Sequence, residues 1–237
     1  MQIRGASALV TGAGRGIGRA VALALGREGA RVALVARTAT QLDEVADEVR
    51  AAGGEALTLP GDLCDPRFPA AAVEAAVAAH GRLQVLVNNA GVGAFAPLAE
   101  TSDETWERVI GTNLSAVFRL TRAALPHLTR GGGHVFMVSS LAGSNAIAHM
   151  SAYCASKAAL DHLAACLMLE VRQQGVKVTT LAPGSVDTTF GASPRGDASW
   201  MLQADDVAAA LIDLLRTRDG AHLSRVELRP ARPKPRV

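Results

Sequence analysis

The stretch 6–36 constrains the fold more than any other part of the chain. An apolar run over 6–11 is followed by a glycine-rich turn at 12–18, a helical pattern over 19–28 and a second apolar run over 31–36. A strand, a glycine-rich turn, a helix and a second strand within about thirty residues form a βαβ unit, whose two strands lie parallel in one sheet. The stretch therefore predicts a parallel sheet covered by helices.

The same alternation of strand and helix patterns continues to residue 228 without an intervening linker. We therefore predict the α/β class, as a single doubly wound (Rossmann) domain over 1–228 with helices on both faces of the sheet. The sheet is predicted to be mostly parallel and to have seven strands, at 6–11, 31–36, 55–59, 83–87, 135–138, 176–182 and 223–228. Residues 229–237 form a Pro/Arg-rich tail, predicted to be extended and either disordered or packed on a partner subunit. The alternative is that the tail is a phosphate-binding arm.

Composition and charge exclude several classes of protein. Hydrophobic residues make up 49% of the chain, which is typical of a buried parallel sheet, but no apolar run reaches the ~18 residues that span a bilayer. The 24 basic and 22 acidic residues are well mixed, which does not favour nucleic-acid binding. Cys64, Cys154 and Cys166 lack metal-site spacing, which predicts reduced, mostly buried thiols and no metal. We expect a cytoplasmic protein with no membrane or nucleic-acid partner.

The glycine-rich turn predicts a nucleotide site formed by Gly12, Arg15, Gly16, Ile17 and Gly18. Glycines let the backbone approach a pyrophosphate, and the following helix offers free N–H groups and the positive end of its dipole. Three glycines alone are weak evidence, but the βαβ context strengthens them.

The end of the second strand bears on which dinucleotide binds. An acidic residue there would bind a ribose 2′-hydroxyl and repel a 2′-phosphate, whereas this strand ends in Arg37. Arg37 has a planar guanidinium suited to a phosphate, and Arg15 supplies a second cation. We therefore predict NADP(H) in preference to NAD(H). The alternative is that Arg37 is a solvated arginine at a strand end.

Three further polar segments follow strands or interrupt a helix. Asp62 and Leu63 follow the third strand, where Asp62 either accepts a bond from an adenine amino group or is a turn aspartate. Residues 88–91 (Asn-Asn-Ala-Gly) follow the fourth strand, at the sheet edge where ligands bind. Asn113 lies within a predicted helix over 104–128, where asparagine is a poor helix former. It is expected to make a structural hydrogen bond or to hold a water molecule.

Tyr153 and Lys157 are the strongest candidates for proton chemistry. Tyr153 is the only tyrosine of the chain, and Lys157 lies four residues later, on the same helix face. A nearby ammonium lowers the pKa of a phenol, so the pair could exchange a proton with a carbonyl or alcohol oxygen. Ser140, at a predicted strand end, could bond the same oxygen. The alternatives are a helix-surface pair without a role and an ordinary strand-end serine.

Together these segments resemble the short-chain dehydrogenase/reductase family, in particular its 3-oxoacyl reductase-like, NADP(H)-dependent branch. The matching segments occur in the family's order and cover 6–188: Thr11–Gly18, Asp62, Asn88–Gly91, Asn113, Ser140, Tyr153-x-x-x-Lys157 and Pro183-Gly184-x-Val186-x-Thr188. Two segments depart from the family pattern: 185–203 is short, and 226–230 lacks the usual glycine-rich ending.

The resemblance implies a role for each matching residue. Tyr153 would be the general acid-base, Ser140 would orient the substrate oxygen, and Lys157 would bind the nicotinamide ribose. Asn113 would hold a water of the proton relay. It also implies a cofactor half near 1–100 and a catalytic half near 101–228. The cofactor would be lined by Asn89, Ala90, Gly91, Tyr153, Lys157, Pro183, Gly184, Val186 and Thr188, besides the residues named above.

The sequence thus predicts an oxidoreductase that transfers a hydride between NADP(H) and a small-molecule carbonyl or secondary alcohol. A general ketone or a 3-oxoacyl thioester would be the substrate, contacting Ser140, Tyr153, Leu141 and Phe190, with Phe95 and Met150 as further wall or ordinary packing. The alternative is a non-catalytic NADP(H)-binding sensor or scaffold. The long apolar helices 104–128 and 152–174 predict a homo-oligomer, either dimer or tetramer.

Overall fold

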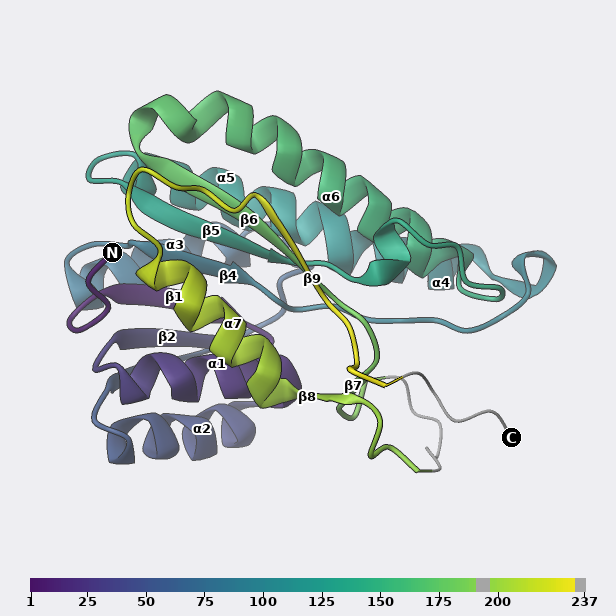
Figure 1. Ribbon diagram of the computed structural model, residues 1–237, viewed down its shortest axis with the longest axis horizontal. Coiled ribbons are helices and arrows are strands. Elements are labelled where there is room, and N and C mark those ends of the chain that lie inside the picture. The colour runs from purple at the N-terminus through teal and green to yellow at the C-terminus, as the bar shows by residue number, and fades with distance from the viewer. Residues whose placement is uncertain (191–196, 233–237) are drawn as a thin grey trace.

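The computed structural model describes residues 1–190 and 197–232, which build one seven-stranded sheet (Figure 1). The strands lie in the order β3-β2-β1-β4-β5-β6-β9, and each neighbouring pair is parallel. Their bounds are β1 (Ser7–Thr11), β2 (Arg31–Ala36), β3 (Glu55–Pro60), β4 (Val85–Asn88), β5 (Gly133–Val138), β6 (Val176–Pro183) and β9 (Arg225–Leu228). The predicted fold class and strand number are confirmed.

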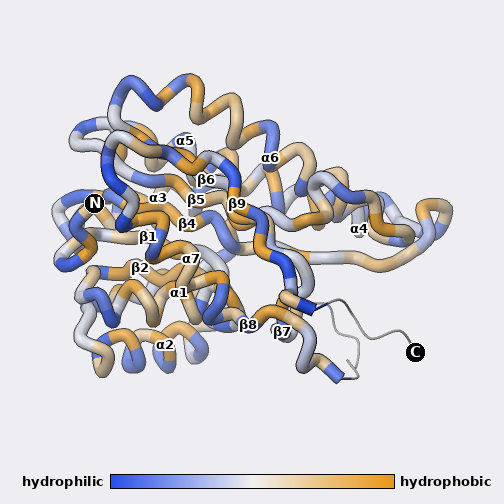
Figure 2. Tube along the Cα trace, viewed as in Figure 1, coloured by the Kyte–Doolittle hydropathy of each residue, from blue (hydrophilic) through white to orange (hydrophobic). Residues whose placement is uncertain are grey.

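Helices cover both faces of the sheet. One face carries α1 (Gly16–Arg27), α2 (Ala39–Ala51) and α7 (Ala204–Arg216), and the other carries α3 (Phe68–His80), α5 (Ala116–Leu128) and α6 (Ser151–Val171). Along β1, Ala8 and Val10 join the first of these two cores and Leu9 joins the second. Successive side chains of a strand point to opposite faces of the sheet, so a strand that is covered on both faces needs apolar side chains on both. Figure 2 shows apolar residues along β1 and β2.

The strand order reverses between β1 and β4, so the loops after these two strands diverge onto opposite faces. A crevice at such a point, outside the carboxyl ends of the strands, is where open α/β sheets bind ligands. The sheet topology therefore fixes where the predicted site residues gather, whatever their own local structure.

The predicted helix over 104–128 is interrupted. It consists of α4 (Asp103–Ile110), a π-helical turn (Gly111–Ser115) and α5. Asn113 lies inside this π turn and is fully buried. A π turn inserts one residue, and such insertions are frequent at functional sites. The poor helix propensity of asparagine marked the right position, but not the kind of irregularity.

Between β6 and α7 the structure contains two short strands that the sequence did not predict. β7 (Val186–Asp187) pairs in parallel with β8 (Leu202–Gln203), through two residues each. Strands this short carry no hydrophobic alternation from which they could be predicted. Of the segment between them, residues 191–196 lie outside the described residues.

The thiol environment differs from the prediction. All three cysteines are free, but Cys64 and Cys166 are exposed and Cys154 is partly buried, so the prediction of mostly buried thiols is wrong. Cys166 lies on α6 next to the buried Leu167, and Cys64 lies in a turn next to the partly buried Leu63, so the apolar pattern of the sequence did not reveal the exposure of either thiol. None of the helices in the described ranges is long and apolar enough to cross a membrane.

His134 generates a prediction about acid stability. It is buried in β5, stacks on Phe136 at 4.0 Å between ring centroids, and its Nε2 lies 2.8 Å from Thr179 Oγ1. Burial, with the nearby positive charge of His222 and Lys177, lowers the pKa of His134 from 6.5 to about 3. Because this folded-state pKa lies below the unfolded one, the stabilisation is present above about pH 6.5 and is lost as pH falls toward 3.

We therefore expect His134→Gln to be less sensitive to acid than the wild type. Between about pH 6.5 and pH 4 the wild type should lose at most about 3 kcal/mol more of its free energy of unfolding than the variant. Urea unfolding at both pH values measures this difference, and His162→Gln, at an exposed position, is the control. Equal losses in the wild type and His134→Gln would contradict the prediction.

Candidate active site

A cleft of about 1650 Å³ opens at the carboxyl ends of the parallel strands. Its lining comes from the turn after β1, the ends of β2 and β3, the loops after β4 and β5, the N-terminal half of α6, and the segment after β6. A volume above the roughly 300–1,000 Å³ of a single-ligand pocket leaves room for a dinucleotide and a second molecule.

The glycine-rich turn lies against the loop after β4. Gly12 and Gly16 adopt positive φ angles of 65° and 55°, which a residue with a side chain rarely adopts. A Cβ atom on Gly12 would lie 2.8 Å from Asn89 Nδ2, and one on Gly18 would lie 2.2 Å from the Gly12 carbonyl oxygen. The glycines therefore permit one close contact with the Asn89 side chain and one between two parts of the turn itself.

Thr11 and Asn89 hold the glycine-rich turn and the loop after β4 together by hydrogen bonds. The Thr11 hydroxyl donates to the Val87 carbonyl and accepts from the backbone N–H groups of Asn89 and Ala90, at 2.9 and 3.0 Å. Asn89 Nδ2 donates to the Thr11 carbonyl at 2.8 Å. The side-chain amide of Asn89 thus holds the turn in place, while Ala90 and Gly91 line the cleft.

At the outer end of the cleft, the exposed Arg15 and Arg37 both line the opening. Arg15 is the N-cap residue of α1, and its side chain does not cap the helix. Asp62 also lines the cleft, but its Oδ1 accepts from the Cys64 N–H at 2.9 Å, so it forms the turn contact that the sequence left as its alternative. Leu63 lies partly buried beside it.

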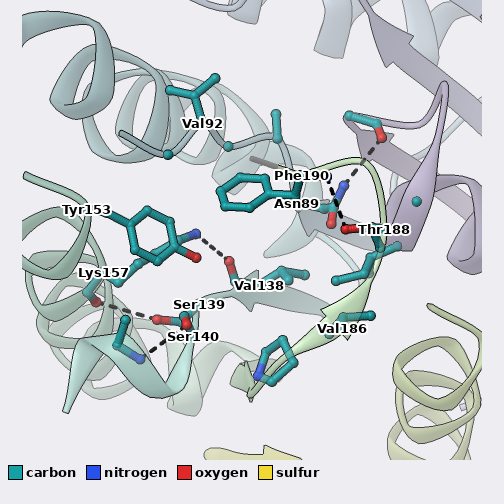
Figure 3. Close-up of a pocket in the computed structure, with 18 of the residues that line it drawn as sticks. Asn89, Val92, Val138, Ser139, Ser140, Tyr153, Lys157, Val186, Thr188 and Phe190 are labelled. Atoms are coloured by element: carbon teal, nitrogen blue, oxygen red, sulfur yellow. Dashed lines mark hydrogen bonds between the residues drawn. The ribbon is translucent and has the colours of Figure 1, made fainter. Parts of the chain in front are cut away.

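At the inner end, Ser140, Tyr153 and Lys157 converge from β5 and α6 (Figure 3). Tyr153 is 9% exposed and Lys157 is 4% exposed, because both point from α6 toward the sheet. Lys157 Nζ donates to the Val138 carbonyl at 2.8 Å and lies 5.8 Å from the centre of the Tyr153 ring. Ser140 Oγ accepts from the Ala142 N–H at 3.1 Å, which orients the hydroxyl.

The electrostatics of this group differ from the expectation. Burial raises the pKa of Tyr153, and hydrogen bonding by Ser140 partly opposes this. Burial also lowers the pKa of Lys157 to about 8, against the opposing charge of Asp161. Lys157 is not among the groups that shift the pKa of Tyr153, so the predicted lowering by its charge is not seen, and the loss of water around the phenol dominates. In this structure the phenol keeps its proton at neutral pH.

Asn113 lies behind the cleft and is not one of its lining residues. Its Oδ1 accepts from the Val92 N–H at 2.8 Å, and its Nδ2 donates to the Val92 carbonyl and to Ser156 Oγ at 2.9 and 3.0 Å. Ser156 in turn donates to the Tyr153 carbonyl at 2.7 Å. The amide thus joins the loop after β4 to α6, which is the structural role that the sequence left open beside a water-holding one.

An apolar wall lies beside the ring of Tyr153. The ring of Phe190 is 5.6 Å from that of Tyr153, and Phe95 stays 73% exposed although it lines the cleft. Leu141 and Met150 line the same region. The sequence missed further lining residues. Some lie in loops without periodicity, namely Ile147, Trp200, Met201 and 229–232, and others lie on α4 and the π turn, namely Glu107, Arg108, Gly111 and Thr112.

The structure thus brings nearly all the predicted site residues to one cleft. The cofactor candidates in its lining are Gly12, Arg15, Gly16, Ile17, Arg37, Asp62, Leu63, Asn89, Ala90, Gly91, Pro183, Gly184, Val186 and Thr188. Gly18 and Asn113 lie outside the lining and support it from behind. A phenol, a hydroxyl and an ammonium at one end, with a glycine turn and two arginines at the other, can bind a phosphorylated ligand and exchange a proton beside it.

Comparison with known proteins places this geometry in a family. A family model described as short chain dehydrogenase matches residues 6–198. A putative ketoacyl reductase of Streptomyces coelicolor is 40% identical over 194 residues, which cover 79% of this chain and 73% of the relative.

Two solved structures match nearly the whole chain. An alcohol dehydrogenase from the archaeon Thermococcus sibiricus, complexed with 5-hydroxy-NADP, has a TM-score of 0.91 at 32% identity, over 97% of this chain and 98% of that chain. A metagenomic short-chain oxidoreductase in complex with NADP has a TM-score of 0.87 at 40% identity, over 98% and 100%. The chain belongs to the short-chain dehydrogenase family.

Proposed function

We propose that the protein is an NADP(H)-dependent oxidoreductase that interconverts a carbonyl compound and a secondary alcohol. The observation that carries this proposal is the convergence of Ser140, Tyr153 and Lys157 on one end of a cleft whose other end is formed by the glycine-rich turn. The NADP complexes of two similar structures support the choice of cofactor.

The cleft fits a dinucleotide on its own geometry. The absence of side chains at Gly12 and Gly16 leaves backbone N–H groups open to a pyrophosphate at the start of α1. Arg37 and Arg15 are proposed to hold a 2′-phosphate, and Val186 and Thr188, which also line the cleft, are proposed to contact the nicotinamide half of the cofactor. The cofactor supplies the hydride. The chain supplies position and the proton.

Tyr153 is proposed as the general acid when a carbonyl is reduced. Its raised pKa keeps the phenol protonated, as a proton donor requires, while Ser140 bonds the same substrate oxygen. Lys157 is proposed to bind the nicotinamide ribose and, through its positive charge, to stabilise the phenolate that remains after proton transfer. Asn113 is proposed to act through position, by fixing the loop after β4 against α6.

The substrate is proposed to be a carbonyl compound with an apolar substituent. Phe95, Ile147, Met150 and Phe190 place exposed or partly exposed apolar surface beside Tyr153, where a large apolar patch indicates a binding site. A general ketone and a 3-oxoacyl thioester both satisfy this requirement. The similarity to a putative ketoacyl reductase favours the second.

The wider setting of the enzyme is proposed from the same observations. A cofactor half over 1–100 and a catalytic half over 101–228 share one cleft, and the three free thiols suit a cytoplasmic location. Exposed Phe118 and Leu169, on α5 and α6, support a homo-oligomer.

A non-catalytic NADP(H) sensor or scaffold is the competing function, but it leaves the enclosed Ser140–Tyr153–Lys157 arrangement unexplained.

The proposal is tested first with Tyr153→Phe. NADPH oxidation is followed against ketones, aldehydes, quinones and 3-oxoacyl thioesters. We expect wild-type turnover with at least one substrate and a loss of about 10³-fold or more in the variant, because the proton donor is removed. NADPH affinity should change little. Turnover that survives in Tyr153→Phe would contradict the assigned role, and tight NADPH binding without turnover would favour the sensor.

The cofactor preference depends on Arg37. Arg37→Ala should weaken NADPH binding about 10-fold to 100-fold, because a charge-assisted contact with the 2′-phosphate is lost, and should leave NADH binding nearly unchanged. Fluorescence titration with both cofactors measures this. Arg50→Ala, which removes an exposed arginine paired with Asp47, is the control. Equal losses for NADPH and NADH would exclude Arg37 from the phosphate site.

Burial of Lys157 predicts a cost in stability. Its folded-state pKa of about 8 lies below the ordinary 10.5, so the wild type gains stability as pH rises through 8 toward 10.5. Lys157→Met carries no charge and lacks this gain. The difference in free energy of unfolding, variant minus wild type, should therefore fall by about 2 kcal/mol between about pH 7.5 and 9.5.

Urea unfolding at the two pH values measures this difference. Lys177→Met is the matched control, because Lys177 is one of the other lysines and its burial is partial. A difference that stays constant with pH in Lys157→Met would show that Lys157 is not held at a lowered pKa.

A further inference from the structure

We propose that Asp161 is a positioning residue of this active site: it anchors the turn that follows Ser140 and supplies the negative charge that keeps Lys157 an ammonium. This inference rests on the proposed function, because it concerns the groups assigned there to binding and proton transfer. The evidence for it is a set of contacts made by Asp161, which has no role in the function proposed above.

The environment of Asp161 is unusual for a carboxylate. It lies on α6 four residues after Lys157, one helical turn farther along the same face. Its side chain is 13% exposed, and Oδ2 lies 2.6 Å from Arg225 Nη1. The other oxygen, Oδ1, is buried and has no hydrogen-bond partner within the described residues. An enclosed carboxylate oxygen without a partner is costly, so its presence calls for an explanation.

The first part of the explanation is contact with the catalytic turn. The short 3₁₀ turn Leu141–Gly143 follows Ser140 directly. A Cβ atom on Gly143 would lie 2.6 Å from Asp161 Oδ2 and 3.1 Å from the Lys157 carbonyl oxygen. The turn therefore touches α6 at Asp161, with no room for a side chain at 143. Arg225 holds the next residue as well, because its Nη2 donates to Ser144 Oγ at 3.3 Å.

The second part is a chain of alternating charges along β9. Arg225 and Glu227 lie two residues apart, on the same face of the strand, with Arg229 two residues farther on. Arg225 Nη2 lies 3.4 Å from Glu227 Oε1, and Arg229 Nη2 lies 2.8 Å from Glu227 Oε2. Arg229 lines the cleft. The ion pairs therefore connect the base of the catalytic turn to the cleft opening, through the segment in which the sequence departs from the family pattern.

The third part is the charge that acts on Lys157. Tyr153 and Asp161 are titratable neighbours on its own helix, β5 presents the Val138 carbonyl, and the loop after β4 presents Gly91. Burial lowers the pKa of Lys157, and the charge of Asp161 raises it. Arg225 faces Asp161 from β9 and offsets part of that charge. Asp161 and Arg225 therefore act on Lys157 with opposite signs.

Because Asp161 and Arg225 are expected to shift the pKa of Lys157 in opposite directions, the proposal can be tested without measuring turnover. The chain has only three lysines, Lys157, Lys177 and Lys234, so an NMR titration of isotope-labelled lysine side chains resolves each one. Lys177→Arg and Lys234→Arg assign the signals. The experiment uses the full chain, with and without saturating NADPH, and compares the midpoint of the Lys157 titration between variants.

Asp161→Asn should lower the midpoint of Lys157 by about half a pH unit or more, and Arg225→Met should raise it. Glu170→Gln removes a carboxylate from an exposed position of the same helix and should leave it unchanged. Midpoints that move in the same direction in both variants, or in neither, would overturn the electrostatic role. Should Asp161→Asn fail to fold, the rise in Arg225→Met still decides the matter.

Asp161→Glu separates charge from position. It keeps the charge but displaces the carboxylate from Gly143, so the Lys157 midpoint should stay close to that of the wild type while kcat for carbonyl reduction falls about 10-fold. An unchanged kcat would overturn the anchoring role. A wild type without turnover that depends on Tyr153 would instead refute the proposed function, and the NMR midpoints would still decide the role of Asp161.

Discussion

The enclosed ammonium of Lys157 is the feature around which the catalytic half is arranged. Removing an ammonium from water is expensive, so each group that faces it must compensate for lost hydration or must supply charge. The Val138 carbonyl accepts a hydrogen bond from the ammonium, and the charge of Asp161 opposes the effect of burial on the pKa of Lys157. Because this bond joins α6 to the end of β5, it contributes to the relative position of Tyr153 and Ser140, together with the packing of the two elements.

The parallel sheet makes this arrangement possible at little cost to the core. Strands that run in one direction end at one edge of the sheet, so the loops after β1, β4, β5 and β6 meet there. Thr11, Asn89 and Asn113 then join neighbouring loops through side-chain bonds to backbone groups. These three polar residues, which resemble site residues in the sequence, thus hold neighbouring loops together by hydrogen bonds, while Gly12, Gly16 and Tyr153 line the cleft.

The sequence predicted the seven strands of the main sheet and most of the cofactor-binding residues that line the cleft. The βαβ periodicity determines the strands, and position at a strand end determines which residues meet in the cleft. It could not predict what depends on three-dimensional surroundings. The direction of the pKa of Tyr153 is set by burial, which spacing does not report. The bonds of Asn113 depend on Val92 and Ser156, which lie far from it in the chain. Asp161 and Arg225 carried no motif, since their pairing spans 64 residues.

The π turn at Gly111–Ser115 has a consequence for how this segment tolerates change in length. One residue advances an α-helix by about 100°, so the inserted residue sets the phase between α4 and α5. Losing any one residue here would restore a regular helix and turn the face of Leu120, Ala124 and Leu128 away from the sheet. Insertions and deletions across this family should therefore avoid the α4–α5 segment and gather in loops such as 130–132, where no such phase must be kept.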